Sequence, residues 1–401
     1  MPWRGVTIMD QRVRFISEYL EGYFPVAELC RQFNISRKTG YKWLNRYEKY
    51  GPLGLEDRKR RPKRCPHKTE AKIVKSIKYH RMKHPTWGPK KILAILEKRN
   101  PDWDNPAEST IAGILNREGL ITGYKRRIRR KHPGCPTTVA TAPNQIWTAD
   151  YKGHFKMRSG AYCYPLTVCD MYSRYLLECD GHKSISRKKT KESFTKLFKE
   201  YGLPQRIRTD NGVPFASNAI GRVSTLSVWW IRLGIYPELI EPGQPQQNGM
   251  HERMHRTLKK EATIPPEKNF RTQQIRFNKF MKEYNTQRPH EALDMKTPSD
   301  LYTPSPRDMP KKLGVWDYPY HFKVRRVSRT GAFRWQSKRV PFTHTLEAEY
   351  IGFEEIDDGI YNVYYCDFLL GRFHEELGKV KDLIERVPIR QRITKESYRR
   401  A

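Results

Sequence analysis

Apolar residues recur at helical spacing between residues 10 and 50, and they predict three short helices. Gly22 ends the first helix, Pro25 opens the second, and Ser36 is a suitable N-cap for the third. The residues expected on the apolar faces are Val13, Ile16, Leu20, Val26, Leu29, Cys30, Phe33, Tyr41 and Leu44. A short helix, a tight turn and a basic third helix indicate a helix-turn-helix DNA-binding domain over residues 1–57.

The third helix would turn a basic face to solvent, where it could lie against DNA. The side chains expected to contact DNA there are Arg37, Lys38, Thr39, Lys42 and Arg46. A plain three-helix bundle with a solvated basic face is the alternative interpretation.

A second helical unit, residues 66–122, lies between two strongly basic runs. Its three helices are predicted by the apolar sets Ile73, Val74 and Ile77, then Ile92, Ile95 and Leu96, then Ile111, Ile114 and Leu115. Ser109 is the expected cap of the last helix and Gly119 its end. We predict a second DNA-binding domain of the helix-turn-helix or winged-helix kind. The basic runs would lie on phosphates through Arg60, Arg61, Arg126, Arg127, Arg129 and Arg130.

From about residue 140 the pattern changes to alternating apolar and polar positions that are interrupted by helical stretches. The predicted strands are 145–156, 161–170, 175–182, 206–209 and 235–240. The predicted helices lie at 194–201, 226–233, 250–258 and 275–284. An antiparallel meander followed by alternating helices and strands indicates a mixed α/β domain over residues 140–300.

The last part of the chain has a third pattern. Residues 298–310 are rich in proline and suggest a hinge. Residues 316–378 alternate apolar and polar, with many Tyr, Phe and Val, and they predict a small all-β barrel.

The net charge of the chain indicates that this multidomain protein binds nucleic acid. Lys and Arg number 77 against 43 Asp and Glu, which gives a formal net charge of +34. With 37% hydrophobic residues the chain folds, so it is not a disordered basic tail. A folded, strongly basic protein most often binds nucleic acid.

Cysteine usage and the absence of long apolar runs bear on the compartment. The seven cysteines are scattered and contain no CxxC pair, which favours reduced thiols over a disulfide framework. The N-terminus lacks the apolar core of a signal peptide, and no run is long enough to span a membrane. We expect a soluble, cytoplasmic protein that associates with the nucleoid.

Three carboxylic acids are the candidate chemistry of the α/β domain. Asp150 and Asp210 each end a strand, and Glu252 lies on the helix that follows a loop rich in Pro, Gly and Gln. Three acids brought together would raise each other's pKa unless a cation lay among them. Hard oxygen ligands of this kind suit Mg²⁺ or Mn²⁺.

The motifs around these acids resemble a known family, the integrase-core DDE transposases of bacterial insertion sequences, which are relatives of the retroviral integrases. The resemblance covers residues 140–300. It rests on Asp150 after Ile146-Trp147, on Arg208-Thr209-Asp210-Asn211-Gly212, on Pro242-Gly243-Gln244-Pro245-Gln246-Gln247-Asn248-Gly249 leading to His251-Glu252-Arg253, and on Tyr284-Asn285 with Arg288-Pro289-His290.

The resemblance implies an RNase H-like core with a mixed five-stranded sheet. It implies that Asp150, Asp210 and Glu252 are the catalytic triad and hold two Mg²⁺ or Mn²⁺ ions. The implied reaction is 3′-end cleavage and strand transfer of double-stranded DNA, at terminal inverted repeats and target, by a homodimer or higher homo-oligomer. The segment between Asp210 and Glu252 is a few residues longer than is usual in that family, and a loop near 217–224 is the expected place of the extra residues.

The helix of Glu252 is expected to have two faces. Met250, Met254 and Leu258 would face the core, while Glu252, His255, Arg256 and Lys259 would share a face toward DNA. The predicted DNA contacts of this domain are His255, Arg256 and Lys259 from this helix, together with Asn211, Gln247 and Asn248.

Alternative functions come from the same residues. His251-Glu252-Arg253-Met254-His255 matches the HExxH pattern of zinc proteases, but that function leaves the charge and the Asp-Asn-Gly turn unexplained. A DNA-binding regulator with a catalytically silent integrase fold would bind DNA without metal-dependent cleavage. Cys65, His67, His80 and His84 make a poor zinc set because only one is a thiolate donor. Asp170 is expected to cap a turn.

Overall fold

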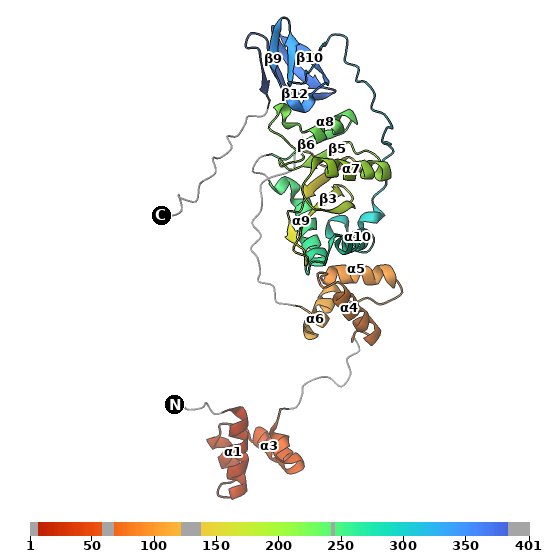
Figure 1. The fold of residues 1–401 in the computed structure, drawn as a ribbon. Coiled ribbons are helices and arrows are strands. Elements are labelled where there is room, and N and C mark those ends of the chain that lie inside the picture. Colours follow the sequence, from red (N-terminus) through yellow and green to blue (C-terminus); the bar gives the residue numbers. More distant parts are fainter. Residues whose placement is uncertain (1–6, 58–67, 122–137, 242–244, 384–401) are drawn as a thin grey trace. The chain divides into compact units, whose positions relative to one another are not determined.

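The computed structural model describes residues 7–57, 68–121, 138–241 and 245–383 (Figure 1). The chain divides into two compact units, Met1–Thr69 and Glu70–Ala401, which are described separately. Among the described residues, no helix is long and apolar enough to cross a membrane. The cysteines in these ranges, Cys30, Cys163, Cys169, Cys179 and Cys366, are free and buried. The basic runs with Arg60, Arg61, Arg126, Arg127, Arg129 and Arg130, and also Cys65 and His67, lie outside the described ranges.

The N-terminal unit contains the three predicted helices. They are α1 (Ile8–Glu21), α2 (Val26–Gln32) and α3 (Arg37–Tyr50), followed by a 3-10 turn, η1 (Gly51–Leu55). Gly22 ends α1 in a left-handed conformation, Pro25 precedes α2, and the Ser36 hydroxyl accepts a hydrogen bond from the Thr39 amide at 3.2 Å. All three predicted boundaries are confirmed.

The predicted core of this unit is partly wrong. Val13, Leu20 and Tyr41 were expected inside, but they are 49%, 62% and 53% exposed. The core is formed instead by Phe15, Ile16, Leu29, Cys30, Trp43, Leu44 and Leu55. One face of each helix can be buried, and the larger rings of Phe15 and Trp43 occupy it, which turns the neighbouring apolar positions to solvent.

The second helical unit has the predicted three helices, α4 (Ala71–Lys83), α5 (Pro89–Arg99) and α6 (Glu108–Arg117). They bury Ile73, Ile77, Trp87, Ile92, Ile95, Leu96, Ile111, Ile114 and Leu115. Ser109 is not the cap, because α6 already begins at Glu108, an acid that favours the first turn of a helix. His80 is buried, and His84 stacks on Trp87 with ring centroids 4.0 Å apart.

A mixed sheet forms the centre of the larger unit. Its strands are β1 (Ile146–Tyr151), β2 (Phe155–Lys156), β3 (Tyr162–Asp170), β4 (Leu176–His182), β5 (Arg206–Thr209) and β6 (Tyr236–Leu239). β3 pairs antiparallel with β1 and β4, while β1, β5 and β6 run parallel. The predicted five-stranded mixed sheet is confirmed, and the two-residue β2 is added beside β3. Asp170 caps the predicted turn, since its carboxylate accepts from the Ser173 amide at 2.8 Å.

Helices cover both faces of this sheet, as expected of an RNase H-like core. They are α7 (Arg187–Tyr201), α8 (Thr225–Arg232), α9 (Gly249–Leu258) and α10 (Phe270–Thr286), with short turns η2 (Ile220–Arg222), η3 (Pro245–Asn248), η5 (Glu291–Leu293) and η6 (Pro298–Asp300) and a π-helical turn η4 (Lys259–Thr263). Trp147 and Ala149 pack with α7 and α8, while Cys169, Leu176 and Cys179 pack with α9 and α10. Alternate strand residues therefore serve two separate cores.

The predicted hinge at 298–310 is wrong, because this segment lies firmly against the core. Tyr302 stacks on Tyr175 with ring centroids 4.4 Å apart. The Arg307 guanidinium donates to the carbonyl oxygens of Pro204 and Gly234, at 2.9 and 2.8 Å. The prolines of this segment keep the backbone extended along the surface of the core, and they do not make a flexible joint.

The C-terminal region is all-β, as predicted. Its strands are β7 (Lys323–Arg326), β8 (Ala332–Trp335), β9 (Lys338–Pro341), β10 (Tyr350–Asp357), β11 (Ile360–Tyr365), β12 (Phe368–His374) and β13 (Lys379–Asp382), with a 3-10 turn η7 (His344–Leu346). Five form an antiparallel sheet in the order β13-β12-β11-β10-β7, and β8 and β9 form a hairpin. Phe333, Trp335, Phe353 and Phe373 fill the space between them.

Two helix glycines give a matched test of packing in the two units. A side chain at Gly40 on α3 would collide with Cys30 and Phe15, whereas Gly113 on α6 has nothing within 4 Å. At both positions, the higher helix propensity of Ala alone would stabilise the helix by about 1 kcal/mol. We expect Gly113→Ala to slow hydrogen exchange in α6 and Gly40→Ala to speed it in α2 and α3. Slower exchange in α3 of Gly40→Ala would contradict this packing.

Candidate active site

The register of two parallel strands brings Asp150 and Asp210 together. Ala149 on β1 lies opposite Thr209 on β5, and the next residue of each strand is the acid. Equivalent positions on neighbouring strands point to the same face of a sheet, so the two carboxylates are neighbours. The Gly212 amide donates to Asp210 Oδ1 at 3.2 Å and holds this carboxylate in its turn.

Two histidines seat the helix of Glu252 on the sheet. His251 Nδ1 lies 2.8 Å from Thr148 Oγ1, and its Nε2 lies 2.7 Å from Thr167 Oγ1. His255 Nε2 lies 2.7 Å from the same hydroxyl. Thr167 is the strand partner of Asp150 and donates to its carbonyl oxygen at 3.0 Å. The position of α9 is therefore fixed relative to Asp150.

These contacts correct the predicted faces of α9. Met254 and Leu258 are buried as expected, and Glu252, Arg256 and Lys259 are exposed. His255 is buried against the sheet, so its predicted place on the solvent face is wrong. Thr167 uses its one proton on the Asp150 carbonyl, so both histidines must donate to it through Nε2–H. The HExxH spacing thus serves packing onto two threonines.

The pKa of Asp150 shows how unfavourable its surroundings are for a free charge. Burial, followed by the nearby Asp210 carboxylate, raises the pKa of Asp150 to about 7, and Glu252 adds to the effect. Burial also raises the pKa of Asp210. His255 Nδ1 lies 3.6 Å from Asp150 Oδ2 but brings no charge, because burial lowers its pKa to about 2. A cation from solvent would relieve this pair.

The side chains that could hold a hard divalent cation here are the two carboxylates of Asp150 and Asp210, with the Glu252 carboxylate nearby. Over the described ranges, no group of three or more His, Cys, Asp or Glu side chains is arranged to hold a metal ion. Asp150 and Asp210 offer hard oxygen atoms, which suit Mg²⁺ or Mn²⁺. Glu252 is close enough to raise the pKa of Asp150, and it is exposed.

Comparison with protein families agrees with the fold. A family described as integrase core domain matches residues 140–245, and a second family of the same description matches 233–298. A helix-turn-helix domain matches residues 11–63, and a homeodomain-like domain matches 39–115. Residues 140–298 of this chain are therefore similar to integrase core domains.

Similar proteins come from insertion sequences and retroviruses. An insertion element IS407 protein of 31.7 kDa from Burkholderia multivorans is 26% identical, over 47% of this chain and 72% of its own length. The transposase of insertion sequence IS904 from Lactococcus lactis is 30% identical over 40% of this chain and 62% of its own length. The Pol polyprotein of radiation murine leukemia virus is 27% identical over 46% of this chain and 30% of its own length.

Two solved structures that resemble this chain are of retroviral proteins. The HTLV-2 integrase catalytic core domain in complex with magnesium is 19% identical and covers 41% of this chain and all of that chain, at a TM-score of 0.34. A simian T-cell lymphotropic virus intasome in complex with a PP2A regulatory subunit is 17% identical and covers 73% of this chain and 97% of that chain, at a TM-score of 0.37.

A buried arginine ties the parts of the integrase core together behind the carboxylates. Arg208 on β5 is 1% exposed and forms an ion pair of 2.6 Å with Glu238 on β6. It donates to the Thr138 carbonyl oxygen at 2.7 Å and to the Gln247 carbonyl oxygen at 3.5 Å. The strand of Asp210 is thereby linked to the residues that precede α9.

The predicted DNA contacts occupy different surroundings. Arg37, Lys38 and Lys42 are exposed on α3, while Thr39 and Arg46 are half-buried. Both Lys42 and Arg46 lie over the ring of Trp43, at 4.3 and 4.9 Å from its centroid.

Around the integrase core the predicted contacts are equally varied. Asn211 is exposed and donates to the Ile240 carbonyl oxygen at 2.8 Å. Gln247 accepts from the Glu241 amide at 2.9 Å, and Asn248 is buried. Arg256 and Lys259 are exposed on the same helix as Glu252.

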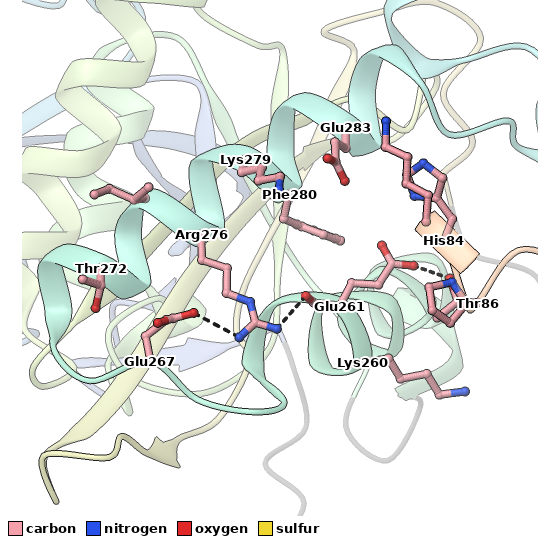
Figure 2. A pocket seen from close by; sticks show the side chains of 13 residues that line it. His84, Thr86, Lys260, Glu261, Glu267, Thr272, Arg276, Lys279, Phe280 and Glu283 are labelled. Carbon is pink, nitrogen blue, oxygen red and sulfur yellow. Dashed lines mark hydrogen bonds and ion pairs between the residues drawn. The ribbon is translucent and has the colours of Figure 1, made fainter. Parts of the chain in front are cut away.

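A separate cavity of about 670 Å³ lies where the second helical unit meets the integrase core (Figure 2). Glu261 accepts from the Thr86 hydroxyl and from the Arg288 guanidinium, and Arg276 donates to the Glu261 carbonyl oxygen. Further ion pairs join Lys90 to Glu291 and Lys98 to Asp300. None of the residues predicted to bind DNA or metal lines this cavity, so it is separate from the carboxylate site.

Three residues that position the carboxylates were not among the predicted site residues, namely Thr148, Thr167 and Arg208. The signal for the threonines was present, because Thr148 and Asp150 alternate with Trp147 and Ala149 along β1. Two histidines four residues apart on the facing helix need polar partners when they are buried. Nothing in the sequence pairs Arg208 with Glu238, because the contact depends on strand order.

The raised pKa of Asp150 predicts a pH-dependent stability difference. Without metal, the folded state holds the Asp150 proton up to about pH 7, so this group's contribution to stability falls as pH rises from about 4 to 7. We expect Asp150→Asn to raise the free energy of unfolding by about 2 kcal/mol at about pH 8 and by little near pH 4. Urea unfolding in EDTA measures this, with the exposed Glu97→Gln as control. A pH-independent difference would contradict the raised pKa.

Proposed function

We propose that this chain is a transposase that cleaves DNA at the 3′ ends of a mobile element and joins those ends to target DNA. The match of residues 140–298 to integrase core domains supports a function in DNA transposition. The observation that carries the finer proposal is the register of β1 and β5, which sets Asp150 beside Asp210.

The proposed cofactor is Mg²⁺ or Mn²⁺, with two ions in each active site. Asp150 and Asp210 would hold them through carboxylate oxygens, and Glu252 would complete the set from α9. Bound divalent ions supply Lewis-acid activation of the phosphodiester and of the attacking oxygen. The buried aspartates favour binding of a cation. Burial raises the pKa of both, and a bound cation would stabilise their charged forms.

The rest of the chain would bring DNA to these carboxylates. Water attacks first and frees a 3′-hydroxyl, which then attacks target DNA, so no Ser or Tyr nucleophile is needed. The exposed Arg256 on α9 and the exposed Lys259 at the start of η4 follow Glu252 and would hold backbone phosphates beside it. The helix-turn-helix of the N-terminal unit would read the terminal inverted repeats through α3. An element has two ends, so we propose a homodimer or larger homo-oligomer on DNA.

The triad is tested by replacing each acid with its amide. Asp150→Asn, Asp210→Asn and Glu252→Gln should each lower cleavage and joining of inverted-repeat DNA by roughly 1,000-fold or more, the scale for losing one preorganised electrostatic group. DNA affinity should stay within a few fold, which gel-shift titration measures. Added Mg²⁺ should raise the melting temperature of the wild type but not of Asp150→Asn.

The control for the triad is Glu97→Gln, which removes an exposed acid from α5. It should cleave and join as the wild type does. Full activity in any triad variant would refute the assignment of that residue. A wild type that binds the repeats without metal-dependent cleavage would support a DNA-binding regulator with a silent integrase fold.

The helix-turn-helix is tested through the salt dependence of binding. Arg37 and Lys42 are exposed on α3, so Arg37→Ala and Lys42→Ala should each reduce the slope of log K against log salt by about 1. Lys72 on α4, which pairs with Glu70, provides the control variant Lys72→Ala. An unchanged slope and an unchanged preference for the repeats would show that another element reads them.

A further inference from the structure

The loop that follows Asp210 connects the active site to the C-terminal all-β region. We define the docking loop as residues 212–224, which include the stretch 217–224 where the extra residues between Asp210 and Glu252 are expected. Ala216 and Val223 form an isolated antiparallel bridge, and the Ser217 hydroxyl donates to the Val223 carbonyl oxygen at 2.6 Å. The loop is therefore a closed hairpin with its tip at η2.

The tip of the docking loop is packed on the C-terminal sheet. A Cβ atom on Gly221 would lie 3.2 Å from Leu370 Cδ2 on β12, and Gly221 has a φ of +67°. A Cβ atom on Gly371 would lie 3.3 Å from Ile220 Cγ2. Two glycines thus allow this close approach, one on each side of the contact.

The hydrophobic core continues from the loop into the C-terminal region. Val223 on the loop and Val228 and Ile231 on α8 are buried in the same cluster as Leu370 and Phe368. Tyr236 on β6 also contacts Phe368, with ring centroids 4.9 Å apart. Figure 1 shows α8 between the C-terminal strands and β5 and β6 of the integrase core. The all-β region therefore shares its interior with the catalytic region.

The base of the docking loop holds the Asp210 turn. The Gly212 carbonyl oxygen accepts from the Phe215 and Ala216 amides, and Phe215 is buried in the same core as Trp230. Arg222 Nη1 donates to Asn211 Oδ1 at 3.3 Å, and Asn211 is the residue next to Asp210. A contact at Ile220 can thus be transmitted to the carboxylate through one closed loop.

We propose that the C-terminal all-β region positions Asp210 by clamping the docking loop at Ile220 and Gly221. This inference rests on the proposed function, because it gives Asp210 a catalytic task. Ile220 and Leu370 would be positioning residues that touch neither DNA nor metal. Misplacing a reacting group by about 1 Å can cost up to a hundredfold in rate, so a distant contact is sufficient to control the chemistry.

The sharpest test uses Ile220, because its Cγ2 methyl is the atom that a Cβ on Gly371 would meet. Ile220→Ala removes Cγ2, while Ile220→Val retains it. We expect Ile220→Ala to increase hydrogen exchange of the amides between 211 and 217 and to lower the cleavage rate at saturating DNA about tenfold. The KM for DNA should change less than twofold. Ile220→Val should behave as the wild type in both measurements.

Two further variants complete the experiment on the full chain. Leu370→Ala should reproduce the Ile220→Ala effects from the other side of the contact, and Leu377→Ala, a leucine that is 56% exposed in the same region, should not. Unchanged exchange and rate in Ile220→Ala would overturn the proposal, and so would an effect confined to the KM for DNA.

Hydrogen exchange also separates this proposal from the proposed function. A wild type without metal-dependent cleavage would refute the transposase activity. The exchange of residues 211–217 in Ile220→Ala would still decide whether the C-terminal region holds the Asp210 turn.

Discussion

Two carboxylates held side by side at the ends of parallel strands are the constraint that the larger unit is built to satisfy. Such a pair repels, and burial makes the repulsion worse, as the pKa of about 7 at Asp150 indicates. The strands cannot separate to relieve it, because β1 lies between β3 and β5 in the sheet. The strain of the free pair is therefore available to be released by a cation.

Three separate supports hold this pair, and each joins parts that are distant in sequence. His251 and His255 fix α9 to Thr148 and Thr167, beside Asp150. Arg208 joins β5, β6 and the residues before α9 from within the core. The docking loop ties the Asp210 turn to the C-terminal sheet. Rigid support from several directions is what a site needs when its charges are arranged in advance of the reaction.

The sequence allowed the carboxylates to be located but not all of what surrounds them. Strand alternation predicts Thr148 and Asp150 on one face and Trp147 and Ala149 on the other, and the structure has this arrangement. The burial of His255 was missed because helical spacing gives a face without saying which side meets the sheet. The same ambiguity placed Val13 and Leu20 inside the N-terminal unit, where Phe15 is found. Periodicity fixes relative positions on a helix, whereas packing against large side chains fixes its rotation.

Long-range contacts explain why the hinge predicted at 298–310 is wrong, and they also explain the role of the loop after Asp210. Proline in 298–310 suggested a hinge, yet Arg307 binds carbonyl oxygens that belong to two other loops. The loop after Asp210 meets Leu370 on β12 at its tip, in a contact that two glycines make possible. Val223 of the same loop is buried in the core that the C-terminal strands share with α8. A loop that is packed at its tip and closed at its base joins the Asp210 turn to the all-β region, whereas a solvated loop of the same length would leave that turn without this support.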